Sequence, residues 1–94
     1  MNKISKDKGV IFVLLERFNK QRFPRLVEMK KVVDRGEPLS KLDHSFIKLV
    51  QTDAGNIGQL VKRNPEYNEI YEKALNLLNE IIEKDLENQK NLHE

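Results

Sequence analysis

A cluster of positive charge between positions 17 and 31 is the part of this sequence best suited to bind a partner. Four of its cations fall within nine residues, and an aromatic side chain lies among them. Such a cluster at the junction of two helices could hold phosphates, with the aromatic ring stacked on a base, or it could face an acidic protein surface. The alternative is a solvated face that nearby acids neutralise. The candidate residues are Arg17, Lys20, Arg22, Phe23, Arg25, Lys30 and Lys31.

A single carboxylate, Asp53, interrupts an apolar helical stripe that continues on both sides of it. An unpaired carboxylate inside a core is costly, so this residue needs either a cationic partner or exposure to water. One interpretation is a buried ionic anchor or ligand contact, with Arg22 or Arg25 as the partner. The interpretation we favour is local: Asp53 caps a helix after a kink, or lies at the edge of the stripe in water.

The remaining candidates for chemistry are weak. The two histidines, His44 and His93, are far apart in sequence, and neither has the spacing to a second ligand that a helix-borne metal site requires. Ser40, Asp43 and His44 have the residue types of a catalytic triad, but neighbours on one helical turn lack an oriented nucleophile and an oxyanion pocket. We expect Ser40 to cap a helix and His44 to face solvent. The sequence therefore predicts no catalytic residue, no metal and no cofactor, and we expect no enzymatic activity.

Glycines at positions 55 and 58 follow Asp53 in a segment that could be mistaken for a ligand-binding loop. The segment lacks the Lys-Ser/Thr of a phosphate loop and the acidic pattern of a calcium loop. The Gly-x-x-Gly spacing is a weak match to an RNA-binding loop, whose accompanying strands are missing. Close approach of two helices at the glycines is the better explanation.

Charge is distributed unevenly along the chain. Residues 1–35 contain ten Lys or Arg against four acids, whereas residues 64–94 contain eight acids against three lysines. The whole chain nevertheless has a formal charge of only +2, and nucleic-acid-binding domains usually keep a larger excess. This asymmetry predicts complementary surfaces that meet within one chain, between two copies, or on an acidic protein partner.

Length and composition limit the chain to one small domain, residues 1–94. Apolar residues make up 38% and charged residues 34% of the chain. This composition is polar for a globular protein but too apolar for a disordered one. The chain has no cysteine, and its short apolar run at 10–15 has no signal-peptide cleavage site. We expect a soluble, cytoplasmic protein that does not enter a membrane, with frayed ends at residues 1–5 and 90–94.

Apolar periodicity and capping signals predict an all-α fold of four helices, at about 6–22, 24–35, 41–63 and 65–88. Pro24 separates the first two, because proline disfavours helical geometry in the residue before it. Gly36 ends the second helix, Ser40 with Asp43 begins the third, and Asn64 caps the fourth before Pro65. A break of the third helix near Asp53 is the alternative to one continuous helix.

The helix faces predict an antiparallel four-helix bundle that homodimerisation completes. Val10, Phe12 and Val13 fall outside the core stripe of the first helix, and the last helix has two adjacent apolar stripes. This surplus exceeds what a small monomer readily covers. We therefore expect a non-catalytic interaction or scaffold protein that forms a homodimer. The first alternative is a nucleic-acid-associated protein that uses the cluster between Arg17 and Lys31, and the second is a ligand-binding or enzymatic bundle involving Asp53.

Overall fold

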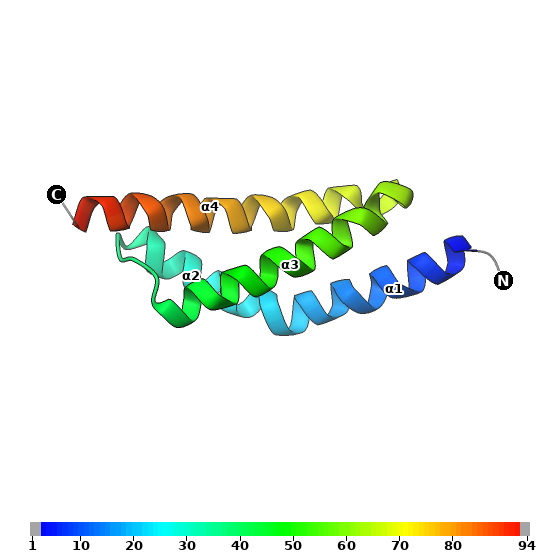
Figure 1. The fold of residues 1–94 in the computed structure, drawn as a ribbon, viewed down its shortest axis with the longest axis horizontal. Coiled ribbons are helices and arrows are strands. Elements are labelled where there is room, and N and C mark those ends of the chain that lie inside the picture. Colours follow the sequence, from blue (N-terminus) through cyan, green and yellow to red (C-terminus); the bar gives the residue numbers. More distant parts are fainter. Residues whose placement is uncertain (1–2, 93–94) are drawn as a thin grey trace.

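Three long helical segments lie side by side and give an elongated molecule with extents of 58 × 20 × 17 Å (Figure 1). The computed structural model describes the backbone of residues 3–92 and the side chains of residues 8–92, and within this range it contains no strand. The prediction of an all-α fold is confirmed. The elements are α1 (Lys3–Arg17), a π-helical turn η1 (Phe18–Arg22), α2 (Phe23–Asp34), α3 (Lys41–Arg63), a 3-10 turn η2 (Pro65–Tyr67) and α4 (Asn68–Leu92).

The first two predicted helices are one kinked segment, so the expected break at Phe23 and Pro24 is wrong. Proline at position 24 removes a backbone donor, and its ring would clash with the carbonyl of Lys20 in a regular α-helix. Here the N–H of Phe23 bonds to the carbonyl of Phe18, five residues back, and Phe23 keeps helical dihedrals. This wider turn admits the proline without ending the helix. The four expected helices thus become three long segments.

Local signals set the connection between α2 and α3. Gly36 has a φ of 87°, and the N–H groups of Gly36 and Glu37 bond to the carbonyls of Val33 and Val32, which is a Schellman motif. Ser40 caps α3 as predicted, because its hydroxyl accepts a hydrogen bond of 3.2 Å from the N–H of Asp43. The carboxylate of Asp43, however, pairs with an arginine of α2 rather than returning to the cap.

Asn64 ends α3 rather than capping the following helix, contrary to the prediction. Its side chain is buried, and the amide donates to the carbonyl of Leu60 at 2.9 Å, while its backbone N–H bonds to Val61. Pro65 then opens the short turn η2, and α4 begins only at Asn68. An asparagine can satisfy free carbonyls as well as free N–H groups, and here its amide serves the carbonyls of α3.

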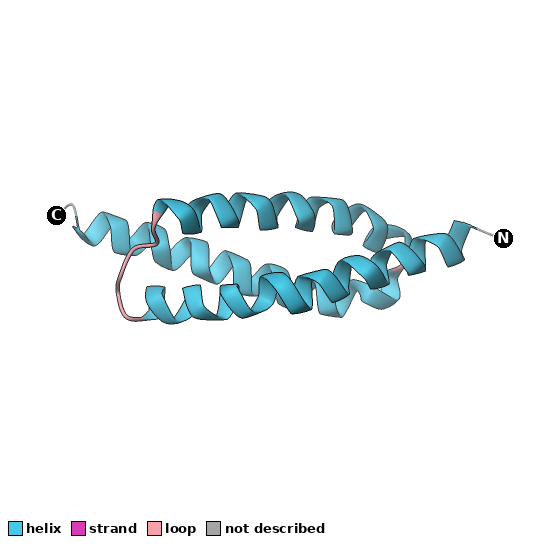
Figure 2. Ribbon diagram, turned by 90° about the horizontal axis from the view of Figure 1, so that it is seen from below, coloured by secondary structure: helices cyan, strands magenta, loops and turns pink. Residues whose placement is uncertain are grey.

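The core lies where α2, the first half of α3 and the second half of α4 meet. The predicted inner face of α2 is buried, whereas Leu42, placed in the stripe of α3, is 76% exposed. Figure 2 shows the helices running along the molecule, with the α2–α3 connection near the C-terminal end. The buried members of this core are Leu26, Met29, Val33, Leu39, Phe46, Ile47, Val50, Leu78 and Ile81.

The terminal helices extend further than predicted. α1 begins at Lys3 and α4 continues to Leu92, so residues 3–5 and 90–92, expected to be frayed, have helical backbone. The outermost residues of that expectation, 1–2 and 93–94, lie outside the described residues.

Candidate functional site

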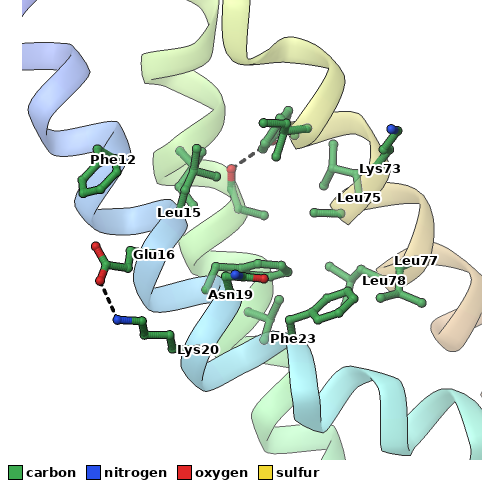
Figure 3. A pocket seen from close by; sticks show the side chains of 17 residues that line it. Phe12, Leu15, Glu16, Asn19, Lys20, Phe23, Lys73, Leu75, Leu77 and Leu78 are labelled. Carbon is green, nitrogen blue, oxygen red and sulfur yellow. Dashed lines mark hydrogen bonds and ion pairs between the residues drawn. The ribbon is translucent and has the colours of Figure 1, made fainter.

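An apolar groove runs between α1 and α4, in the half of the molecule that contains the N-terminus. Its volume is about 720 Å³. In Figure 3 the side chains of α1 and α4 face each other across it, and α3 lies behind them as its floor. The large apolar side chains among those that line it include Phe12, Leu15, Phe18, Phe23, Ile57, Ile70, Leu77 and Leu78.

The groove exists because the kinked segment changes neighbours along its length. α2 packs against α4, whereas α1 packs against α3. Of the side chains between Lys8 and Arg17, only Ile11 is fully buried. The space between α1 and α4 is therefore left without the helix that would fill it in a four-helix bundle.

Large apolar side chains are exposed along the groove and on the adjoining surface of α1. Phe12 is 64% exposed and Ile70, across the groove, is 55% exposed. Val10 and Val13, on the outer side of α1, are also exposed, as is Phe23 where η1 joins α2. Phe12, Phe23 and Ile70 line the groove itself, and exposed apolar side chains gathered in this way are typical of interaction surfaces.

Charged side chains line the rim of the groove in pairs. On the α1 side, Glu16 lies 2.7 Å from Lys20, as the dashed line in Figure 3 shows. On the α4 side, Lys73 lies 3.6 Å from Glu69. These side chains are largely exposed, so the pairs contribute little stability and can exchange partners.

The floor of the groove is held by a close approach of α3 and α4 at Gly58. The hydroxyl of Tyr71 donates to the carbonyl of Ala54 at 2.9 Å. A Cβ atom on Gly58 would lie 2.5 Å from that hydroxyl oxygen, so only glycine leaves the tyrosine this position. The expected close helix approach therefore occurs at Gly58, whereas Gly55 faces open space.

Asp53 is paired with two arginines of the kinked segment. Arg22 Nε lies 3.2 Å from Asp53 Oδ2, and Arg17 contacts Oδ1 at 3.5 Å. Residues five apart share a face only where the turn is widened, so η1 is what brings both guanidinium groups to one carboxylate. α3 is continuous through this position, and Asp53 therefore does not cap a second helix. It lies outside the groove.

The other cations of the basic cluster also have acidic partners within the chain. Arg25 pairs with Asp43 at 3.3 Å and lies 4.3 Å from the centre of the Phe46 ring, which is a cation–π contact. The two lysines at the end of the cluster pair with acids of α2, and Lys30 also reaches Glu80 of α4. Of the seven predicted residues, Lys20 and Phe23 line the groove, and the cluster as a whole does not gather into one site.

Among the side chains of residues 8–92, ion pairs join the basic and acidic parts of the sequence at two points. Lys8 of α1 lies 3.3 Å from Glu66 of η2, and Lys30 of α2 lies 3.8 Å from Glu80. The hydrogen bond between Lys30 and Asp34 raises the pKa of the lysine and lowers that of the carboxyl, because it favours the charged form of both groups. Part of the charge asymmetry is therefore balanced internally.

A buried polar network that the sequence pattern did not reveal fastens the α2–α3 connection to α4. Asp85 accepts hydrogen bonds from the backbone N–H of Leu39 at 2.8 Å and from Gln89 at 2.9 Å, and Nε2 of His44 lies 2.8 Å away. Burial would raise the pKa of Asp85, but these hydrogen bonds outweigh it and hold that pKa below its usual value. His44 is thus engaged with Asp85 rather than simply facing solvent.

Asn88, less than one helical turn beyond Asp85, also joins α4 to the α2–α3 connection. Its buried amide donates to the carbonyls of Val33 at 2.9 Å and Glu37 at 3.0 Å, at the end of α2. Both polar residues continue the buried stripe of α4 from Ile81 at helical spacing, which is the sequence signal that could have identified them. Their role is structural, since they join backbone groups of the same chain.

Over residues 8–92, whose side chains are described, no group of three or more His, Asp or Glu is placed to hold a metal ion. Among the helices of residues 3–92, none is long and apolar enough to cross a membrane. Comparisons of the chain with protein-family models, with curated proteins and with solved structures give no significant match.

Proposed function

We propose that this protein is a non-catalytic helical interaction protein that works as a homodimer, with the groove between α1 and α4 as its contact surface. The observation that carries the proposal is that large apolar side chains are exposed both in this groove and on α1 beside it. The groove has space for a further helix, and the exposed apolar side chains of α1 are not covered by the described part of the chain. In a symmetric dimer, each copy places an exposed helix in the groove of the other, so that the same surface forms both sides of the interface.

The size of the apolar surface suits a dimer. Taking roughly 150–250 Å² for a fully exposed large side chain, the exposed residues of the groove and of α1 offer on the order of 400 Å² per copy. A stable interface buries about 800 Å² per partner, a little more than half of it apolar. The groove and its surroundings therefore supply most of the apolar area that such an interface needs.

The shape of the groove favours a helix as its occupant. It has two helical walls and a helical floor, which is the geometry that receives the apolar face of an amphipathic helix. Filling it would give a four-helix arrangement around α3 and α4, with the fourth helix supplied by another molecule. This intermolecular bundle differs from the one expected from the sequence, in which each chain supplied all four helices and homodimerisation completed the bundle.

The other two candidate functions lack a comparable observation. The arginines of the basic cluster are engaged with Asp53 and Asp43, so phosphates would have to displace existing ion pairs. Asp53 holds two guanidinium groups and does not line the groove, which makes it a structural anchor between α3 and the kinked segment. Neither residue group offers an open site for a ligand.

The proposal is tested by measuring molecular mass in solution by sedimentation equilibrium over about 1–100 µM. We expect the wild-type chain to change from monomer to dimer in this range, and Phe12→Glu to remain monomeric because a charge enters the apolar groove. The matched control is Leu86→Glu, since Leu86 is 62% exposed on α4 but does not line the groove. A wild-type protein that stays monomeric, or a control that dissociates as fully as Phe12→Glu, would contradict the proposal.

A further inference from the structure

We infer that the helix occupying the groove is α1 of the second copy, antiparallel to the resident α1 and centred on Phe12. This inference rests on the proposed homodimer and adds its architecture. Each copy places α1 in the groove of the other, so the partner contributes residues to the site and the site is incomplete without it.

A stripe of three side chains on α1 borders the path of the incoming helix. Lys8, Phe12 and Glu16 are spaced by four residues and therefore share one side of the helix. Phe12 and Glu16 line the groove, which shows that this side faces it. A helix lying in the groove must pass directly along this stripe.

The charges of the stripe determine the orientation of the incoming helix. In an antiparallel pair centred on Phe12, Lys8 lies opposite the partner's Glu16, and Glu16 lies opposite the partner's Lys8. In a parallel pair, Lys8 would face the partner's Lys8 and Glu16 would face the partner's Glu16, which is repulsive. The antiparallel pair thus creates two ion pairs across the two-fold axis where the parallel pair creates two repulsions.

The present partners of these charges do not prevent this exchange. Lys8 is paired with Glu66 at 3.3 Å and Glu16 with Lys20 at 2.7 Å, and the four side chains are between 44% and 70% exposed. Ion pairs at this exposure are weak, so new partners at the interface can replace them or share the charges. Lys20 remains near the rim and keeps the local charge balanced.

Two further features of α1 fit a helix that is covered on more than one side. Gly9 lies beside the stripe and has no heavy atom within 4 Å of the place where a Cβ would be, so a second helix backbone can approach it closely. Val13, 62% exposed, lies on the outer side of α1, away from its own core. A helix seated in a groove with two walls and a floor covers such a residue, whereas an outer surface helix does not.

The orientation is tested by cross-linking, because the natural chain has no cysteine. Lys8→Cys and Glu16→Cys are prepared separately and treated with a short bismaleimide, alone and mixed. The antiparallel pair predicts efficient cross-linking only in the mixture, joining one chain of each kind. Efficient cross-linking of Lys8→Cys to itself would overturn the antiparallel arrangement, while leaving the homodimer and the proposed function intact.

Charge reversal provides a second readout that does not depend on cysteine chemistry. In the antiparallel pair, Lys8→Glu or Glu16→Lys alone replaces two attractions by two repulsions and weakens dimerisation roughly tenfold. The double variant Lys8→Glu/Glu16→Lys restores the wild-type affinity. Single reversals that leave affinity unchanged would overturn the inference, since a parallel pair already has like charges opposite. A wild-type chain that is monomeric by sedimentation would overturn the proposed function and this inference together.

Discussion

The two halves of this molecule are built from the same three helical segments, but they bury their apolar side chains to different extents. In the half containing α2, apolar side chains from three helices form a closed core, and a buried network of Asp85 and Asn88 fastens the connection beside it. In the half containing α1, α1 and α4 stand apart and leave a groove with exposed apolar walls. One half is therefore closed within the chain, and the other is the half that the proposed dimer completes.

The polar groups of the two halves follow the same division. In the closed half, the buried carboxylate and amide bond backbone groups that would otherwise be unsatisfied, which fixes one arrangement of the chain. In the open half, charged side chains lie on the rim in exposed pairs that can be rearranged. In the proposed function, the closed half holds the helices in place and the open half provides the contact surface.

The largest effect is expected in the core of the closed half. Ile81 is fully buried, so Ile81→Ala removes apolar contacts and leaves a cavity. It should lower the free energy of unfolding by about 2–5 kcal/mol, and urea denaturation followed by circular dichroism measures this loss. The matched control is Leu86→Ala on the same helix, which should cost only about 0.5 kcal/mol. Leu86 is mostly exposed, and equal losses at the two positions would remove the distinction between core and surface.

The pH dependence of stability at Asp85 provides a second test of the closed half. Asp85→Ala leaves the Leu39 N–H unsatisfied and should cost about 1–3 kcal/mol at pH 7. The pKa of Asp85 is lowered in the folded state. Its carboxylate therefore contributes stability above the unfolded pKa of about 3.9, and this contribution is lost as pH falls through the folded value. The variant should lose less stability than wild type between pH 5 and pH 2.

The pH dependence is checked by urea unfolding at several pH values between about 2 and 7. Asp34→Asn is the control, because the pKa of Asp34 is also lowered but its carboxylate is exposed and bonds only to a lysine side chain among its described partners. We expect Asp34→Asn to flatten the acid dependence less than Asp85→Ala does. The reverse order would show that the network around Asp85 does not fasten the closed half.

Two glycines of α3 test the floor of the groove. Gly55→Ala adds a methyl group in open space and should stabilise the protein by about 1 kcal/mol through helix propensity. Gly58→Ala gains the same propensity but displaces Tyr71 from the carbonyl of Ala54. Losing that hydrogen bond should make it about 1 kcal/mol less stable than Gly55→Ala. Thermal unfolding compares the two variants directly, and equal stabilisation by both would show that the contact at Gly58 is not tight.

The smallest effect on folding is expected at Phe12. Its side chain is mostly exposed in the single chain, so Phe12→Ala should change the stability of dilute, monomeric protein by at most about 0.5 kcal/mol. At high concentration, where we expect the proposed dimer to stabilise the wild-type protein, the variant should be less stable than wild type. Urea denaturation at about 1 and 100 µM separates the two contributions. A large loss in dilute protein would mean that Phe12 belongs to the core of the monomer.

Signals that act within a few residues could be read from the sequence. Gly36 ends α2 and Ser40 begins α3 as predicted, because each acts on the backbone next to it. The spacing of apolar residues located the buried face of α2 and the continuity of α3. These features depend on local geometry, which the chain specifies by itself.

Features that depend on the arrangement of whole helices could not be read in this way. The π-helical turn keeps the chain helical through Pro24. Burial of the Asn64 side chain determines that it bonds to α3 rather than capping the following helix. The apolar surplus on the first helix was visible, and it predicted an unfilled surface. The position of that surface between α1 and α4 could not be predicted, because it depends on which helices pack against each other.

Amide hydrogen exchange at low and high protein concentration tests the division into two halves most directly. If a second copy fills the groove, amides of α1 between Lys8 and Arg17 should exchange more slowly as concentration rises from about 1 to 100 µM, because dimerisation suppresses their opening. Amides of α2 between Leu26 and Val33 should change much less, since that helix is already closed within the chain. Exchange in α1 that does not depend on concentration would contradict an open half completed by a second copy.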